Sequence, residues 1–276
     1  MLIQEIETLA RGFTANSQLN YVTAEDALRT DLIGMKLWDG ILIGTAEAND
    51  PLFDKMRKEG ALNMGTMLPH DWLPDAASVI YFFLPFTEDV KKANAKDRDI
   101  PADEWLHARI EGQAALAASG EQIAAYLREK GYSAIFPTTD PRFKMLSPYE
   151  SNWSERHTAY VCGLGTFGLS KGLITEKGMA GRFGSIITNA PIPATERPYS
   201  NPFEYCTMCG ACQARCPADA IDKSKGVIQG KDHTLCSPYL KKMTFPPHGA
   251  HQKIRYGCGK CQVKVPCESK IPKKPQ

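Results

Sequence analysis

A concentration of cysteines near the end of the chain constrains the fold more than any other feature. Eight of the nine cysteines lie between residues 206 and 267. Disulfide frameworks belong to small secreted chains, whereas clustered cysteines in a cytosolic protein are more often metal ligands. Glu5 and Glu7 stand where a signal peptide carries Lys or Arg, and no apolar run reaches the roughly 18–20 residues of a membrane span. We therefore expect a cytoplasmic protein without membrane contact, whose C-terminal part binds metal.

The first cysteines of this group follow the spacing C-x2-C-x2-C-x3-C-P. They are Cys206, Cys209, Cys212 and Cys216, followed by Pro217. In bacterial ferredoxins three thiolates of such a run hold one [4Fe-4S] cluster, and the fourth holds a second cluster. A zinc site is the alternative, but zinc takes four ligands and would leave the run overfilled. The spacing therefore favours iron–sulfur clusters.

The remaining cysteines complete two sets of four. By the ferredoxin pattern the first cluster is held by Cys206, Cys209, Cys212 and Cys267, and the second by Cys216, Cys236, Cys258 and Cys261. His248 and His251 lie between these ligands. A solvated loop, redox tuning and substrate contact all stay open for the two histidines.

Charge is distributed unevenly along the chain. The net charge is +2, yet residues 222–276 carry 12 Lys or Arg against three Asp or Glu. Basic segments can bind nucleic acid or an acidic partner, and most are solvated surface. An oxidised all-cysteine cube carries about −2, because four thiolates outweigh the charge of its core. We expect the lysines to offset this charge, and we do not expect nucleic acid as a partner.

Helix and strand patterns alternate in the first part of the chain. Helices are predicted at 1–13, 51–58, 102–132 and 154–161, and strands at 40–46, 77–86, 133–136 and 181–191. The long helix is predicted with an interruption near Ser119 and Gly120, and Ser154 is the predicted cap of the last helix. Residues 138–152 are predicted to form a functional loop.

This alternation predicts an α/β sandwich. Near Pro198 the composition becomes rich in cysteine and lysine. We therefore predict an α/β domain at 1–197 and a ferredoxin-like double-cluster domain at 198–276.

Gly163, Gly165 and Gly168 have the G-x-G-x-x-G spacing of dinucleotide-binding turns. That motif needs a strand before the glycines and a helix after them. Here a predicted helix enters and predicted strands leave, so the pattern argues against a dinucleotide. The missing side chains let the backbone approach another segment or a large flat ligand. Cys162, beside the glycines, is best interpreted as a small buried apolar residue.

A helix that runs into these glycines, followed by two cysteine runs with a lone Cys236 between them, resembles epoxyqueuosine reductases and, more distantly, respiratory reductive dehalogenases. The resemblance covers roughly residues 75–267. It implies a nitroreductase-like α/β domain that holds a base-off cobalamin, and two [4Fe-4S] clusters that deliver electrons to it. Two features depart from the family. Cys261 and Cys267 are separated by five residues instead of three, and the helical repeats that bind transfer RNA are not found before Gln276.

The resemblance also suggests site residues. The catalytic Asp of epoxyqueuosine reductases falls near Tyr149, dehalogenases use a Tyr as proton donor, and Glu150 and Asp140 are the neighbouring candidates. The expected cofactor-binding residues are Gly163, Leu164, Gly165, Thr166, Phe167, Gly168, Glu155, Ser237 and Tyr239.

These observations favour an oxidoreductase that passes electrons through two clusters to a corrinoid and reduces a small electrophilic molecule. Such an enzyme implies an electron donor of the ferredoxin or flavodoxin type. The alternative is an electron-transfer protein that serves a partner enzyme and has no corrinoid chemistry of its own. No cobalt-ligating D-x-H-x-x-G motif is present, which is compatible with base-off binding.

Overall fold

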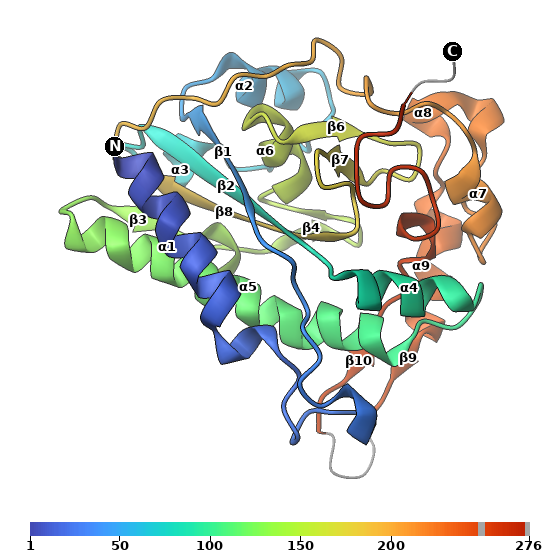
Figure 1. The fold of residues 1–276 in the computed structure, drawn as a ribbon. Helices are drawn as coiled ribbons and strands as arrows, with labels where there is room; N and C mark the ends of the chain where they lie inside the picture. Colours follow the sequence, from blue (N-terminus) through green and yellow to red (C-terminus); the bar gives the residue numbers. More distant parts are fainter. Residues whose placement is uncertain (248–251, 274–276) are drawn as a thin grey trace.

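An antiparallel four-stranded sheet forms the centre of the computed structural model, which describes residues 1–247 and 252–273 (Figure 1). Its strands, in spatial order, are β1 (Leu42–Glu47), β2 (Ser78–Pro85), β8 (Gly181–Thr188) and β3 (Ala134–Ile135). The part of the molecule that contains this sheet is called the α/β half. Its helices are α1 (Leu2–Asn16), α2 (Pro51–Lys58), α3 (Pro69–Trp72), α4 (Glu88–Lys96), α5 (Asp103–Glu129) and α6 (Glu155–Val161). The predicted α/β class is confirmed.

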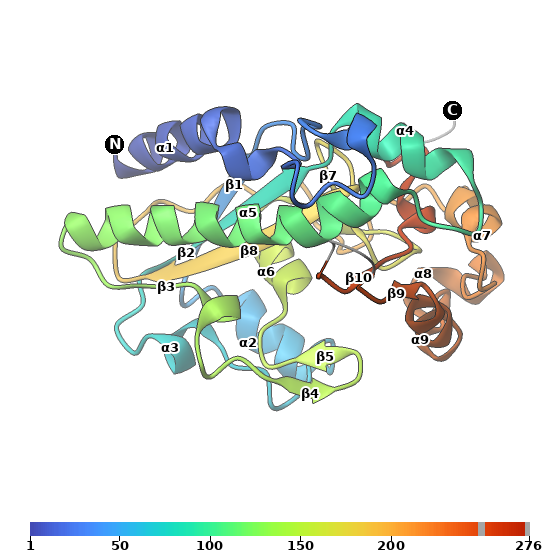
Figure 2. The ribbon, with the colours of Figure 1, turned by 90° about the horizontal axis from the view of Figure 1, so that it is seen from below.

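Strand β2 is buried along its whole length and contributes to two cores. Successive side chains of a strand point to opposite faces. Ile80 and Phe82 therefore join the core under α1 and α5, while Tyr81 and Phe83 join the core under α2 and α6. The helices lie on both sides of the sheet in Figure 2, as an α/β sandwich requires.

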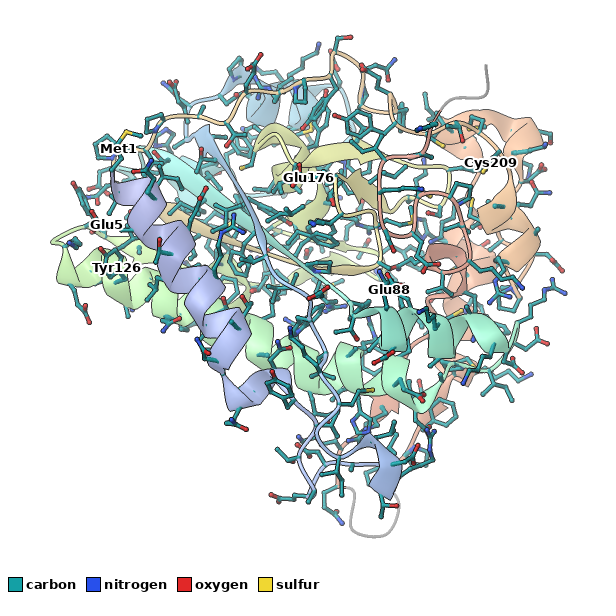
Figure 3. All side chains as sticks on the ribbon, viewed as in Figure 1. Met1, Glu5, Glu88, Tyr126, Glu176 and Cys209 are labelled. Carbon is teal, nitrogen blue, oxygen red and sulfur yellow. The ribbon has the colours of Figure 1, made fainter. Side chains whose placement is uncertain are left out.

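Helix α5 runs without a break, so the predicted interruption near Ser119 and Gly120 is wrong. A Cβ at Gly120 would lie 2.7 Å from the ring of Phe136, so glycine is needed there for close packing and does not end the helix. Helix α1 lies along α5, and the Tyr126 hydroxyl donates a hydrogen bond to the Glu5 carboxylate (Figure 3).

The segment predicted as a loop at 138–152 contains a short hairpin of β4 (Met145–Ser147) and β5 (Glu150–Ser151). Buried Asn152 organises it, since its carboxamide accepts from the Lys144 N–H at 3.0 Å and donates to the Arg142 carbonyl at 2.8 Å. The helix predicted at 154–161 is confirmed as α6. Ser154 is its N-cap residue, but the hydroxyl contacts His157 Nδ1 at 2.7 Å and no backbone N–H.

The C-terminal half, which contains the eight clustered cysteines from Cys206 to Cys267, consists of short elements. They are α7 (Ala211–Arg215), α8 (Gly226–Gln229), α9 (His233–Lys242), β9 (Thr244–Phe245) and β10 (Arg255–Tyr256). Its core combines a few aliphatic side chains with cysteines. The loop between α4 and α5 holds this half in place, because the Asp97 carbonyl accepts from Arg215 and the Asp99 carbonyl accepts from the Tyr239 hydroxyl.

The connection between the halves packs on the α/β half. The Thr45 hydroxyl donates to the Pro193 carbonyl at 2.6 Å, and Arg197 pairs with Asp50 at 2.6 Å. The domain boundary at 197/198 stays a prediction. Among the helices of the described residues, none is both long enough and apolar enough to span a bilayer.

Candidate redox site

The first predicted set of cluster ligands lines one cavity. Cys206, Cys209 and Cys212 come from the loop before α7 and from α7 itself, and Cys267 comes from the last described segment. The N–H of Leu169, in the α/β half, donates to Cys206 Sγ at 3.4 Å. Hydrogen bonds to sulfur are among the factors that tune cluster potentials. This donor set fits a [4Fe-4S] cluster.

The second predicted set comes from three segments. Cys216 ends α7, Cys236 lies on α9, and Cys258 and Cys261 lie in the turn after β10. Burial raises the pKa of Cys261, and the nearby Cys236 and Cys216 raise it further. The Ala220 N–H donates to Cys216 Sγ at 3.3 Å. These thiols are therefore neighbours in space, and they fit a second cluster.

The two sets adjoin each other. Burial raises the pKa of the Cys212 thiol to about 12, and Cys261 of the other set adds to that shift. Cys209 is exposed and lies at the edge of the molecule (Figure 3). The first set is therefore nearer to solvent.

Burial disfavours the thiolate form of cysteines in both sets, Cys212 and Cys267 in the first and Cys258 and Cys261 in the second. It raises the pKa of Cys267 to about 12 and that of Cys258 to about 11. Bound metal must therefore stabilise the thiolates, and assembly releases protons. In the described part of the chain, no three His, Cys, Asp or Glu side chains are grouped closely enough for a single metal ion. A cube distributes its thiolates over four irons, so this spacing is compatible with a cluster.

Lys260 is a fully buried cation between two ligands of the second set. Its Nζ donates to the Asn94 carbonyl at 2.9 Å, the Asn94 Oδ1 at 3.0 Å and the Ile100 carbonyl at 2.7 Å. Burial lowers the pKa of this ammonium, and the adjacent Cys258 opposes the shift. Lys260 thus places a positive charge beside Cys258, a predicted ligand of the second set.

The glycine stretch forms a hairpin of β6 (Gly165–Phe167) and β7 (Leu173–Thr175). A helix enters it and a strand leaves, which agrees with the argument against a dinucleotide site. A Cβ at Gly165 would lie 1.9 Å from the Ile174 carbonyl oxygen, and one at Gly163 would lie 3.1 Å from the Glu196 carbonyl oxygen. Both glycines therefore serve close approach of other chain segments. Leu164, Thr166, Phe167 and Gly168 are buried in the same packing.

The predicted acids occupy different environments. Tyr149 lies in the β4–β5 turn, is 46% exposed and stacks on His233 of α9, with ring centroids 5.5 Å apart. Glu150 accepts from Asn63 at 3.1 Å. The hydrogen bonds of Arg142 lower the pKa of Asp140, so this carboxyl is charged at neutral pH and is poorly suited to donate a proton.

Glu155 lies inside the molecule near β2 and β8. Its Oε1 accepts from the Ser185 hydroxyl at 3.1 Å, whereas its Oε2 is buried without a hydrogen-bond partner. Burial raises the pKa of Glu155 to about 7. The hydroxyl of Tyr81 is also buried and interacts with this carboxyl. Glu155 is thus a group that changes protonation near neutral pH.

The remaining predicted residues are placed as follows. Ser237 lies on α9, and Tyr239 of the same helix donates to the Asp99 carbonyl at 2.5 Å, so its hydroxyl ties the halves together. Cys162 is fully buried, and burial raises its pKa well above the usual range, in agreement with the structural interpretation. The predictions for His248 and His251 lie outside the described residues.

Sequence reasoning missed three arginines whose charges interact, one of which, Arg182, also interacts with Glu155. They are Arg109 on α5, Arg156 on α6 and Arg182 on β8. Burial lowers the pKa of Arg182 to about 10, and the charges of Arg109 and Arg156 contribute. The three come from distant segments, so no local sequence pattern signals their proximity.

Comparison with known proteins supports the cluster-binding half and the fold. Residues 203–222 match the 4Fe-4S binding domain family. The sequence matches no curated protein. An epoxyqueuosine reductase structure is 16% identical, with a TM-score of 0.55 over 99% of this chain and 70% of that one.

Two further structures show the same similarity. A catabolic reductive dehalogenase is 16% identical, with a TM-score of 0.56 over 97% of this chain but 37% of its own length. An epoxyqueuosine reductase with an epoxyqueuosine-modified tRNA-Tyr stem loop is 17% identical, with a TM-score of 0.52 over 97% of this chain and 66% of that one. The resemblance noted in the sequence is thus confirmed as a shared fold.

Proposed function

We propose that this protein is an iron–sulfur oxidoreductase that delivers electrons through two [4Fe-4S] clusters to a corrinoid in the α/β half, for reduction of a small electrophilic molecule. The observation that carries the proposal is the pair of adjoining four-thiol sets, with Cys209 at the surface and Cys261 toward the interior. When bound, the clusters supply one-electron transfer and the corrinoid supplies a strongly reducing cobalt.

The order of the thiol sets suggests a direction. The Cys206 set is nearer to solvent, where a ferredoxin or flavodoxin can dock. Cys261 of the second set lies near Arg156 of the α/β half, because the charges of the two groups interact. The second set therefore adjoins the half in which we place the reaction.

The corrinoid is supported by the shared fold and by unpartnered polar atoms. Arg109 Nε is buried without a hydrogen bond in the described part of the chain, and the Tyr81 hydroxyl is buried against the Glu155 carboxyl. Buried polar groups of this kind normally have partners, and a bound molecule can supply them. The glycines themselves contact protein, so side chains would form the binding surface.

For proton transfer we propose Tyr149, which is accessible in its hairpin, and Glu155, whose carboxyl titrates near neutral pH. Glu155 can hold a proton at Oε2, and the hydrogen bond from Ser185 fixes its orientation. A group with a pKa near the working pH is the best general acid.

The alternative function is electron transfer to a partner enzyme. The packing of Gly163 and Gly165 against the chain's own segments favours it, because these glycines then need no ligand. Iron, sulfide and cobalt analysis of protein purified anaerobically from cells supplied with cobalamin separates the two. We expect about eight irons, about eight sulfides and about one cobalt per chain. Eight irons without cobalt, and without cobalamin binding in titration, would leave the electron-transfer function.

Single variants test the ligand assignment. Cys212→Ala and Cys216→Ala should each reduce the iron content, and each should remove a different cluster as judged by electron paramagnetic resonance. Loss of the same cluster signal in both variants would contradict the assignment of Cys216 to the second set.

A further inference from the structure

The cavity of the first thiol set lies at the edge of the molecule, where Cys209 is exposed (Figure 3). Half-buried Met208 lines it beside this thiol, and exposed Pro266 lines it from the segment before Cys267. Among the described residues, the cavity lining contains no Asp, Glu, Lys, Arg or His. A protein that approaches this edge therefore meets a small and mostly apolar surface around the cluster ligands.

The side chain of Lys223 crosses this edge. Its backbone N–H donates to Gln213 Oε1 at 2.8 Å, which holds the segment against α7. A Cβ at Gly210 would lie 3.0 Å from Lys223 Cδ and 3.7 Å from its Nζ. Gly210 directly follows Cys209 and lines the cavity. The exposed ammonium group of Lys223 is thus placed at the open side of the first thiol set.

Two more exposed lysines adjoin the cavity from the last described segment. Lys264 directly precedes two residues that line it, and Lys273 directly follows Pro272, which also lines it. The turn that begins at Lys264 is fixed, because the Glu268 carboxylate accepts from the Lys264 backbone N–H and the Glu268 N–H donates to the Val265 carbonyl at 3.0 Å. We call Lys223, Lys264 and Lys273 the lysine rim.

The lysine rim has no internal counter-charge. Among the described residues, no carboxylate is within ion-pair distance of its three ammonium groups, whereas Lys55 and Lys58 of α2 each pair with one. The neighbouring Asp222 carboxylate accepts from the Ser224 N–H at 2.9 Å and from its hydroxyl at 2.7 Å. The three ammonium groups are therefore available to a partner.

We propose that the lysine rim and the apolar edge within it form the docking surface for a small acidic protein that carries one electron. The proposal rests on the proposed function, since it assigns the point at which electrons enter. An oxidised cube carries about −2 and repels an acidic carrier, and the rim offsets this repulsion. An apolar centre with a polar rim is also the usual anatomy of a protein–protein interface.

The transfer at this surface is a single one-electron step. The reduced carrier is oxidised by one electron, and the first cluster is reduced, so that its charge changes from about −2 to about −3. No covalent bond forms or breaks. Nucleic acid fits the surface less well, because proteins bind unpaired bases by stacking them on aromatic side chains. None of the described residues that line the cavity is aromatic.

Stopped-flow reduction of the cluster-loaded, full-length protein by reduced flavodoxin, an acidic carrier, tests the surface. The variants are Lys223→Glu and the double variant Lys223→Glu with Lys264→Glu. The matched control is Lys242→Glu, which reverses an exposed charge of the same half on α9, outside the cavity lining. A second measurement follows electron transfer from the reduced protein to cytochrome c, a basic protein. Iron content and thermal unfolding verify that each variant is loaded and folded.

We expect reduction of wild-type protein by flavodoxin to slow as salt is raised, because screening weakens the attraction of opposite charges. Lys223→Glu should lower the second-order rate constant about tenfold at low salt, and the double variant should lower it further, within the range of electrostatic steering. Both variants should accelerate transfer to cytochrome c, a gain that misfolding does not produce. Lys242→Glu should match wild type in both measurements.

Equal flavodoxin rate constants in wild type and the double variant at low salt would overturn the docking surface. So would an equal loss in Lys242→Glu. Transfer RNA binding that the rim variants weaken, with flavodoxin reduction unchanged, would assign the surface to nucleic acid instead. A protein without iron after anaerobic purification would refute the proposed function together with this surface, so the iron analysis distinguishes the two failures.

Discussion

The α/β half buries two apolar cores on the faces of one sheet, whereas the half from Cys206 to Cys267 has a small core that combines a few aliphatic side chains with cysteines. Burial also disfavours the thiolate forms of Cys212 and Cys267 unless metal binds them. A core this small contributes little apolar burial, and metal binding then contributes the missing stability. One half is thus a self-sufficient scaffold, and the other depends on what it binds.

Removal of iron should show this difference most strongly. After anaerobic chelation we expect amide protons between residues 206 and 267 to lose protection against exchange, while β2 and α5 stay protected. Hydrogen exchange followed by mass spectrometry measures both halves at once. Cys162→Ala is the matched control, because its buried thiol lies outside both sets and its loss should leave about eight irons in place. Protection that persists in the C-terminal half without iron would refute the dependence.

Glu155 provides the most direct test of proton transfer in the α/β half. Glu155→Gln should slow turnover by roughly 10²- to 10⁴-fold, the usual contribution of a positioned acid, without loss of iron. We expect Tyr149→Phe to slow turnover less, because its exposed ring is held only by a stacking contact with His233. The reverse order of effects would assign the proton to Tyr149.

The same carboxyl predicts a pH dependence of stability. The pKa of Glu155 is about 7 in the folded protein and 4.5 in an unperturbed carboxyl, so the folded state binds more protons between these values. The free energy of unfolding should therefore fall as pH rises from about 4.5 to about 7. Glu155→Gln should flatten this slope in urea titrations, whereas Glu150→Gln should not.

Gly165 tests whether the β6–β7 hairpin of the α/β half is closely packed. Gly165→Val should destabilise the protein by about 1–3 kcal/mol, the usual cost of overpacking, because its Cβ would overlap the Ile174 carbonyl. Gly168→Ala is the control, since its Cβ would meet nothing closer than the end of the Ile174 side chain at 3.3 Å. Unfolding in denaturant measures both. Unchanged stability in Gly165→Val would show the hairpin to be more open than described.

Lys260 joins the two halves electrostatically. Lys260→Met should lower the reduction potential of the second cluster by something on the order of tens of millivolts, because a nearby positive charge favours the reduced, more negative cluster. Potentiometric titration followed by electron paramagnetic resonance detects the shift. Exposed Lys270→Met is the matched control and should have no effect. Equal potentials in wild type and Lys260→Met would refute this role.

The smallest effect is expected with nucleic acid. Part of the positive charge of the C-terminal half is used internally: Lys260 is buried, and Lys253 pairs with Asp26 at 2.7 Å. We therefore expect only weak transfer RNA binding that declines steeply as salt is raised, as non-specific electrostatic binding does. Selective transfer RNA binding that persists at about 200 mM salt would contradict this expectation.

Local patterns predicted much of the fold. Helix α2 occupies the predicted range, and α1, α6 and β2 differ from their predicted ranges by a few residues, because apolar periodicity within each segment determines these elements. Predictions failed where distant residues decide. Gly120 packs against the ring of Phe136 without interrupting α5. The hydrogen bonds of the Asn152 carboxamide stabilise a hairpin in a segment whose sequence is typical of a loop.

The sequence by itself determined the chemistry of the C-terminal half, because cysteine spacing over a few residues dictates which thiols can reach one cluster. Only the tertiary structure decided the electrostatics of the α/β half. The pKa of Glu155 depends on burial by other segments, and Arg109, Arg156 and Arg182 become neighbours only when α5, α6 and β8 pack together. Ligand spacing is a property of adjacent residues, whereas desolvation and charge proximity arise from contacts between residues far apart in the chain.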